Sequence, residues 1–317
     1  METDIRNSFI LQIILWGHVL SFKVCNYSKL EALCLGQIID GKALAAEIDL
    51  QTKAEVMQLK ERGIVPHLAV VLVGDDPASH IYVRNKKRRA EKLGIQSTVC
   101  QFPSSVTEAT LLKEIDRLNH DASVHAILVQ MPLPPQIDEF KVTLAIDPRK
   151  DADGFHPVNM GRLLQNKTDH TPVACTPRGI MQMLHKYNIN PEGKKAVVIG
   201  RSMIVGKPMA ALLLNANATV TVAHSHTKNL SELTKQADIL VVATGIAHFI
   251  KANQVKDGAV VIDVGMNRDQ NGKLTGDVDF AEVSPKASFI TPVPKGVGPM
   301  TITMLMRQTI DLTKWSI

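Results

Sequence analysis

The chain has 317 residues, of which 45% are apolar and 21% are charged, and this composition is typical of a globular protein. Aromatic residues make up 4%, which argues against a protein that binds single-stranded nucleic acid, because such sites stack bases on aromatic rings. The formal net charge of +5 favours anionic ligands without requiring DNA or RNA. The four cysteines show no paired spacing, so we expect neither a disulfide framework nor a zinc site, and a reducing, cytoplasmic compartment.

Residues 1–34 lack the alternating helix and strand patterns of the rest of the chain. The apolar run at 8–22 is interrupted by polar or small residues and is shorter than the about 20 residues that span a bilayer. It also makes a poor signal peptide, because acidic residues outweigh the single arginine before it. We therefore expect residues 1–34 to be an extension outside the folded body of the protein, without membrane attachment; an interfacial helix is the alternative.

From residue 37 onward the predicted elements alternate between helix and strand. Asp40 can cap a helix that runs to about Arg62. The run His67–Val73 (HLAVVLV) is continuously apolar, as in a strand buried on both faces of a parallel sheet. The series continues with a helix at 78–93, a strand at 95–101, a helix at 107–122 and a strand at 124–130.

A second series follows a loop-rich stretch at 147–166. Its strands are expected at 196–199, 219–223, 239–243, 259–264 and 289–292, and its helices at 205–215 and 301–314. Strands that alternate with helices imply right-handed crossovers and a mostly parallel sheet. The sequence therefore predicts two α/β domains with a cleft between them.

The segment Gly200–Pro208 (GRSMIVGKP) lies between a predicted strand and a predicted helix, where dinucleotide folds bind a diphosphate on free amides. Ser202 replaces the second glycine of the usual G-x-G-x-x-G pattern, so an ordinary tight turn is the alternative. The next strand ends in HSHTK at 224–228, without the acid that holds a ribose hydroxyl in NAD enzymes. Hydroxyl and cationic groups there, together with Arg201, favour a ribose phosphate and therefore NADP. The two histidines have no third ligand at metal spacing, so we expect no metal site.

An unusual polar stripe lies on the helix predicted at 78–93. Ser79, Tyr82, Val83 and Lys86 fall at i, i+3, i+4 and i+7, and hence on one face. Taken singly, the tyrosine would be a core residue and the lysine a solvated one. Together, near the carboxyl end of a parallel strand, they indicate a binding site. Gln130 ends a neighbouring predicted strand and is expected to approach Lys86 from the side.

Three further segments carry polar or rigid patterns. Asp153, in the loop DADGF between the two domains, is either a site carboxylate or a turn aspartate before glycine. The basic run at 84–89 lacks interleaved aromatics, so we expect a solvated face rather than a nucleic-acid site. The loop at 291–302 (TPVPKGVGPMTI) combines prolines with glycines and is suited either to packing against a flat ligand or to a stiff connection between domains.

From residue 36 to its end the chain resembles the bifunctional methylenetetrahydrofolate dehydrogenase/methenyltetrahydrofolate cyclohydrolase family. The resemblance rests on S-x-x-Y-V-x-x-K at 79–86, VQMPL at 129–133, D-x-D-G at 151–154, GRS-x-x-VG-x-P at 200–208 and P-x-GVGPMT at 294–301. Three residues depart from the family's pattern, namely Met131, Ala152 and Lys295, and the last stands in place of a glycine.

The resemblance implies a folate-binding catalytic domain made of 35–154 and 299–317, and a Rossmann-like NADP-binding domain at 155–298. It implies NADP-dependent oxidation of 5,10-methylenetetrahydrofolate to the 5,10-methenyl form, then hydrolysis to 10-formyltetrahydrofolate, in one-carbon metabolism. Loss of hydride from a carbon between two nitrogens gives a delocalised cation, so positioning should supply most of the first step. The hydrolysis needs proton transfers, which a lysine of lowered pKa can carry near neutral pH.

Residue roles follow from the same resemblance. Lys86 is expected to be the central catalytic group, with Tyr82 stacked on the folate, Gln130 holding Lys86, and Asp153 hydrogen-bonded to the pterin. The other expected substrate contacts are Ser79, Val129, Met131, Pro132, Pro294, Lys295, Gly296, Val297 and Gly298. The expected NADP contacts are Gly200, Arg201, Ser202, Ser225 and Met266.

The family also implies a homodimer, for which the exposed strands of the second domain are candidates. The alternatives are a dehydrogenase with only one of the two activities and an NADP-binding module that has lost catalysis. A nucleic-acid binder built on residues 84–89 is a more distant alternative.

Overall fold

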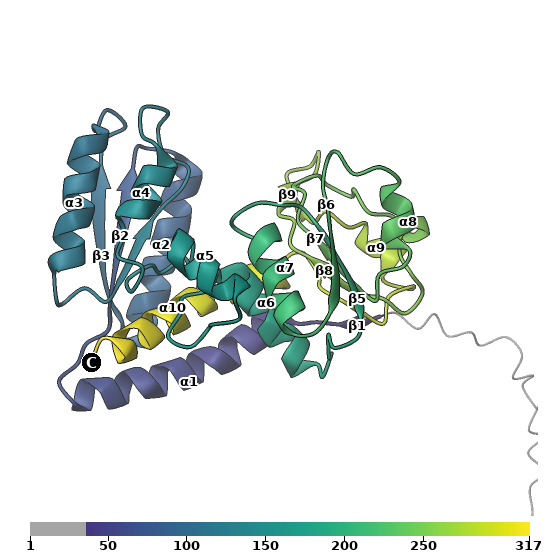
Figure 1. Ribbon diagram of the computed structural model, residues 1–317, viewed down its shortest axis with the longest axis horizontal. Helices are drawn as coiled ribbons and strands as arrows, with labels where there is room; N and C mark the ends of the chain where they lie inside the picture. Colours follow the sequence, from purple (N-terminus) through teal and green to yellow (C-terminus); the bar gives the residue numbers. More distant parts are fainter. Residues whose placement is uncertain (1–35) are drawn as a thin grey trace, which may run out of the picture. The chain divides into compact units, whose positions relative to one another are not determined.

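The computed structural model describes residues 36–317, so the predicted extension at 1–34 lies outside the described residues. Within the described range no helix combines the length and the apolarity needed to cross a bilayer. The described strands form two parallel sheets, one of three strands and one of six, and a small antiparallel hairpin (Figure 1). Both main sheets are flanked by helices, so two α/β domains are present.

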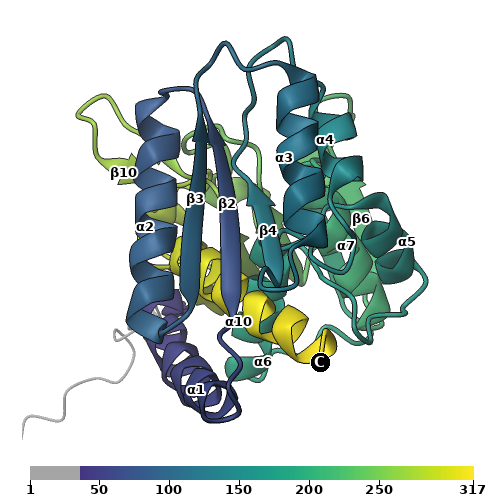
Figure 2. The same cartoon turned by 90° about the vertical axis from the view of Figure 1, so that its left-hand side faces the viewer.

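The smaller sheet has the strand order β3 (Gln96–Phe102), β2 (His67–Val73) and β4 (Ala126–Val129). Helices α2 (Pro77–Leu93) and α3 (Glu108–His120) lie on its opposite faces, as Figure 2 shows. All residues of β2 are buried. Because successive side chains of a strand point to opposite faces, Val70 packs in the cluster that contains α2 and Val71 in the cluster that contains α3. The prediction of a strand buried on both faces is confirmed.

An aspartate caps the start of each of the first two helices, and the cap at Asp40 was predicted from the sequence. Helix α1 (Gly41–Glu61) follows Asp40, whose carboxylate accepts a hydrogen bond from the Ala43 amide at 2.9 Å. Helix α2 follows Asp76, which accepts from the Ser79 amide at 2.8 Å, and ends at Gly94, where φ is 82°. The polar stripe therefore starts within the first turn of α2, close to the carboxyl end of β2.

The larger sheet has the strand order β1 (Gln37–Ile38), β11 (Phe289–Ile290), β8 (Val260–Asp263), β7 (Ile239–Val242), β5 (Lys195–Ile199) and β6 (Thr219–Ala223). Every neighbouring pair is parallel. Strand β1 was not predicted: the chain first pairs with this sheet and only then enters the smaller one. Two-residue strands such as β1 carry too little pattern to be seen in the sequence.

The other elements are α4 (Glu139–Ala145), α5 (Pro157–Leu164), α6 (Cys175–Lys186), α7 (Gly206–Asn215), α8 (Leu230–Thr234), η1 (Ala252–Gln254), β9 (Asn267–Arg268), β10 (Leu274–Thr275), α9 (Phe280–Val283) and α10 (Val297–Trp315). The stretch at 147–166 is less loop-rich than predicted, because it contains α5. Helix α10 starts at Val297, earlier than the predicted residue 301, so the end of the glycine-proline loop is its first turn.

The two domains share a hydrophobic core. One cluster of buried side chains contains Val70 of β2, Met304 of α10, Met183 of α6 and Val198 of β5. Helices α1, α6 and α10 pack against one another within this cluster. The hydrophobic cores of the two domains are therefore continuous through these three helices, and both sheets pack in the same cluster.

Candidate active site

Lys86 and Gln130 are hydrogen-bonded to each other. The Lys86 Nζ donates to Gln130 Oε1 at 2.9 Å, and Gln130 Nε2 donates to the Met131 carbonyl at 2.7 Å. The second bond fixes the amide so that its oxygen faces the amine. The predicted approach of Gln130 to Lys86 from the neighbouring strand is present in the structure.

Strand pairing brings Asp153 to the same place. Gln130 follows β4, and its amide donates to the Val71 carbonyl of β2 at 2.9 Å. Beyond the loop, Asp151 pairs in parallel with Ile127 of β4. Because paired strands advance together, Asp153 lies level with Val129 at the end of β4, and the two residues line the same small cavity.

The carboxyl group of Asp153 is in an unfavourable environment for a charge. Burial raises the pKa of Asp153 to about 6, the Lys86 ammonium acts to lower it, and the Asp151 carboxylate acts to raise it. The Lys86 charge therefore acts directly on Asp153. A carboxylate in such a position gains from a ligand that donates hydrogen bonds to it.

The residues before and after Asp153, namely Ala152 and Gly154, each form a hydrogen bond with a buried polar side chain. The Asp151 carboxylate accepts from the amides of Gly154 at 3.0 Å and His156 at 2.8 Å, and from Asn159 Nδ2 at 2.9 Å. From α10, Gln308 Nε2 donates to the Ala152 carbonyl at 2.7 Å.

No role was predicted from the sequence for Asp151, Asn159 or Gln308. The available signal for Gln308 was an amide between the apolar residues Met304, Leu305 and Leu312 of the terminal helix, where it is fully buried. The D-x-D-G motif contains Asp151, but the sequence does not show that its carboxylate points into the protein.

The remaining polar stripe of α2 divides between core and surface. Ser79 is buried, whereas Tyr82 is 41% exposed. The Tyr82 hydroxyl donates to Met266 Sδ at 3.9 Å, which joins the polar stripe of α2 to the loop after β8. Val129 and Met131 line, with Asp153, a cavity of about 10 Å³, close to the volume of one water molecule. Pro132 is exposed beside it.

The C-terminal loop is packed against the start of α1. The Lys295 carbonyl accepts from the Lys42 amide at 2.9 Å, and a Cβ on Gly41 would overlap the Gly296 carbonyl oxygen. Lys295 has φ of 87°, in the region that favours glycine, which is the residue that the family pattern has there. Pro294, Lys295 and Gly298 are exposed, and Gly296 and Val297 are buried.

The glycine turn at 200–206 closes tightly on itself. Gly200 has φ of 120°, and a Cβ there would overlap the Ala243 carbonyl oxygen; a Cβ on Gly206 would overlap the carbonyl oxygen of Gly200. Side chains at both positions are therefore excluded, as in turns that bring the backbone close to a diphosphate. Ser202 Oγ accepts from the amide of Val205 at 3.1 Å, at the start of α7.

Sheet register places Arg201 beside the end of β6. Ile199 of β5 pairs with Ala223 of β6, and the Gly200 amide donates to the Ala223 carbonyl at 2.8 Å. Arg201 and Ser225 therefore each lie two residues beyond the same rung, and both are exposed. These residues fit a dinucleotide that carries a phosphate on its ribose.

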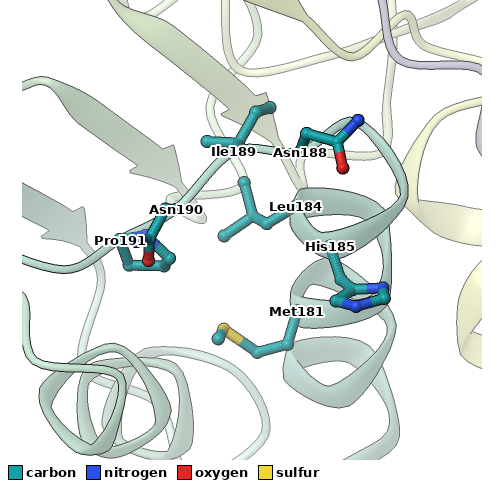
Figure 3. A pocket seen from close by; sticks show the side chains of 7 residues that line it. All are labelled: Met181, Leu184, His185, Asn188, Ile189, Asn190 and Pro191. Atoms are coloured by element: carbon teal, nitrogen blue, oxygen red, sulfur yellow. The ribbon is translucent and has the colours of Figure 1, made fainter.

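A larger hollow, of about 370 Å³, lies at the end of α6. It is lined by Met181, Leu184, His185, Asn188, Ile189, Asn190 and Pro191 (Figure 3). The lining includes none of the predicted site residues, and apolar side chains and asparagines predominate in it. We therefore assign the chemistry to the Lys86 region and not to this hollow.

Comparison with known families identifies the family of the chain. Residues 39–153 match the catalytic domain of tetrahydrofolate dehydrogenase/cyclohydrolase, and residues 174–317 match the NAD(P)-binding domain of the same family. The chain belongs to the tetrahydrofolate dehydrogenase/cyclohydrolase family. It is 71% identical to the bifunctional protein FolD of Pediococcus pentosaceus over 89% of this chain and 100% of that protein.

Solved structures agree with this membership. The bifunctional FolD methylenetetrahydrofolate dehydrogenase/cyclohydrolase of Campylobacter jejuni is 49% identical, with a TM-score of 0.88 over 89% of this chain and 99% of that one. The Trypanosoma brucei enzyme, complexed with NADP and an inhibitor, is 38% identical, with a TM-score of 0.84 over 89% of this chain and 98% of that one. The predicted family, the Rossmann-like second domain and the dehydrogenase/cyclohydrolase function are confirmed.

Replacing Asp153 by Asn should stabilise the protein in the absence of ligand at alkaline pH. The folded-state pKa of about 6 lies above the ordinary value of 3.8, so stability is lost as the pH rises through 6 and the buried carboxyl ionises. Asp153→Asn avoids this loss and should gain about 1–3 kcal/mol at pH 8 but nothing near pH 4. Urea unfolding at the two pH values measures this difference.

Asp75→Asn is the matched control, because the Asp75 side chain is 85% exposed, and it should change stability at neither pH. If the Asp153→Asn variant were less stable than the unmodified protein at pH 8, the ionised Asp153 carboxylate would not be destabilising, which would contradict the assignment.

Proposed function

We propose that one site around Lys86 carries out both reactions of the family. These are NADP-dependent oxidation of 5,10-methylenetetrahydrofolate to the methenyl form and hydrolysis of that form to 10-formyltetrahydrofolate. The observation that carries the proposal is the hydrogen bond between Lys86 and Gln130, because it fixes an amine at the end of β4, the strand that the segment of Asp153 pairs with. Burial raises the pKa of the Asp153 carboxyl, and the Lys86 charge acts to lower it. When bound, NADP accepts the hydride.

For the first reaction the residues of this chain position the folate. The Asp153 carboxylate would accept hydrogen bonds from the donor edge of the pterin, and the partly exposed ring of Tyr82 would stack on the folate. Tyr82 also touches Met266, on the dinucleotide side, so the two ligands would meet between these residues. Holding two reactants in register is the main contribution that this step needs.

For the second reaction Lys86 accepts a proton and then donates it. The oxygen of a water molecule forms a bond to the methenyl carbon, and one of its protons passes to Lys86 Nζ, which acts here as the neutral amine. The bond from that carbon to one ring nitrogen then breaks, and Nζ gives its proton to the leaving nitrogen. The remaining hydroxyl proton on the carbon leaves to solvent as the formyl C=O forms, so one proton is released overall. Gln130 keeps Nζ in place during both transfers.

We also propose that the two domains bind different ligands. Residues 35–154 and 299–317 would bind folate, and this is supported by the packing of α10 on β2 and β4. Residues 155–298 would bind NADP through Gly200, Arg201, Ser202, Ser225 and Met266. A cytoplasmic location is consistent with the free thiols of Cys100 and Cys175.

We propose a homodimer formed through the edge of the larger sheet. In the described part of the chain β6 is an edge strand, and Val222 on it is 39% exposed. Leu214, on the neighbouring helix α7, is 58% exposed. An exposed apolar edge strand is suited to burial against a second copy.

Lys86→Met should lower cyclohydrolase activity by about a hundredfold or more, because the group that relays the proton is lost. The dehydrogenase rate should fall less, since hydride transfer requires no proton relay. Formation and decay of the methenyl absorbance, followed with methylenetetrahydrofolate and NADP, report both activities in one assay.

Lys87→Met is the matched control, because Lys87 lies on the same helix with its side chain 47% exposed and should leave both rates unchanged. Wild-type hydrolysis by Lys86→Met would refute the assignment. Methenyl formation without decay in the unmodified protein would indicate a dehydrogenase alone, and NADP binding without turnover would indicate an inactive binding module.

Arg201→Ala should raise the KM for NADP by about tenfold or more, because a hydrogen bond to a charged phosphate is lost, and should leave the KM for NAD unchanged. Lys194→Ala, at the opposite end of β5, should change neither value. Equal effects of Arg201→Ala on the two cofactors would contradict the ribose-phosphate assignment.

Light scattering should give the mass of two chains for the unmodified protein. Val222→Lys should shift it to the mass of one chain, because a charge cannot be buried at an apolar edge. Val65→Lys is the control, since Val65 is similarly exposed, at 42%, and lies in the other domain. A monomeric unmodified protein would rule out the dimer.

A further inference from the structure

Two aspartates of the larger domain are buried among backbone amides, and neither has a role so far. Asp263 ends β8 and is 3% exposed, and Asp277 follows the hairpin β9–β10 and is 0% exposed. Their hydrogen bonds tie together segments that are distant in the sequence. A buried carboxylate is retained only where such bonds compensate its desolvation.

Asp263 connects the end of β8 to the segment after the hairpin. Its Oδ1 accepts from the amides of Gly265 and Asp277, each at 2.9 Å, and its Oδ2 accepts from the amide of Val278 at 3.0 Å. The loop at 264–275 is therefore closed at its base by one carboxylate.

Asp277 connects the same place to the loop after β7. Its Oδ2 accepts from the Thr244 amide at 2.5 Å, from the Thr244 hydroxyl at 3.0 Å and from the Gly245 amide at 3.0 Å. Its Oδ1 accepts from Asn267 Nδ2 at 2.9 Å. One side chain thus holds the loops that follow two adjacent strands.

Two glycines make this packing possible. A Cβ on Gly265 would overlap the Asp277 carboxylate, and a Cβ on Gly276 would overlap the Asp263 carboxylate. The positions of both carboxylates therefore depend on the absence of side chains at 265 and 276.

The loops held in this way surround the dinucleotide side of the site. Ala243, which precedes Thr244, is the residue against which Gly200 packs. Met266, which follows Gly265, contacts the Tyr82 hydroxyl. On the folate side, the hydroxyl of Thr291, the first residue of the glycine-proline loop, accepts from the Asp263 amide at 2.7 Å.

We propose that Asp263 and Asp277 are positioning residues for the dehydrogenase reaction, which hold the loops at 244–246 and 265–267 in the arrangement that receives the dinucleotide. They lie behind these loops and touch no reacting atom. The proposal rests on the proposed NADP site. Hydrolysis of the methenyl form uses no dinucleotide, so the two activities of one protein separate this role from a general contribution to folding.

Asp277→Asn is the most direct test. At least one of the four donors around Asp277 would then face an amide N–H in place of an oxygen, which shifts the loops while the size of the side chain is kept. We expect the KM for NADP to rise by about tenfold or more, with the KM for methylenetetrahydrofolate and the cyclohydrolase rate unchanged. A direct titration with NADP should show the same loss of affinity.

Gly265→Ala is a second, independent variant. It adds only a buried methyl group, which displaces the Asp277 carboxylate, and it should reproduce the change in the KM for NADP. Asp238→Asn is the matched control, because Asp238 also accepts from a backbone amide, that of Lys195, but precedes β7 at the opposite end of the sheet. It should leave both activities unchanged.

Two results would overturn the proposal. One is a wild-type KM for NADP in both Asp277→Asn and Gly265→Ala. The other is a parallel loss of both activities in both variants, including through failure to fold, because the carboxylates would then support the whole domain and not the dinucleotide loops. If the unmodified protein fails to oxidise methylenetetrahydrofolate with NADP, the proposed function itself is wrong, which distinguishes the two failures.

Discussion

The hydrogen bond from the Lys86 amine to the Gln130 amide is the constraint on which the site depends. It joins a helix to the end of a strand on which that helix packs, and the Met131 carbonyl fixes the amide from the other side. The amine is thereby held at the end of β4, and its charge favours the ionised form of the Asp153 carboxyl, which burial disfavours. A carboxylate can attract a cationic folate intermediate, and the lysine in its neutral form can accept and return a proton.

The shared core explains how two sheets keep this site in register. Helices α1, α6 and α10 belong to one apolar cluster with strands of both sheets. From α10, the Gln308 side chain donates to the carbonyl of Ala152, the residue before Asp153. The first turn of the same helix is the end of the glycine-proline loop, which starts at Thr291. Substrate-side and cofactor-side groups are therefore attached to the same rigid elements, so their separation depends little on flexible connections.

The sequence predicted most of the long elements and the approach of Gln130 to Lys86, because these depend on local signals, but it missed helix α6. The seven-residue apolar run of β2, the Asp40 cap and the i, i+3, i+4, i+7 stripe of α2 can each be read from a short window. Strand β1 and the roles of Asp151 and Gln308 could not be predicted, because they depend on partners far along the chain. The early start of α10 was hidden by Gly298 and Pro299, which resemble a loop but are tolerated in the first turn of a helix.

A crystal structure with NADP and a methylenetetrahydrofolate analogue bound together tests the central assignment most directly. The account predicts the analogue between Tyr82 and Asp153, with Lys86 Nζ at a hydrogen-bonding distance of about 2.6–3.2 Å from the atoms that flank the reacting carbon. An analogue bound at the hollow beside α6, or one whose reacting carbon lies beyond the reach of Lys86, would contradict it.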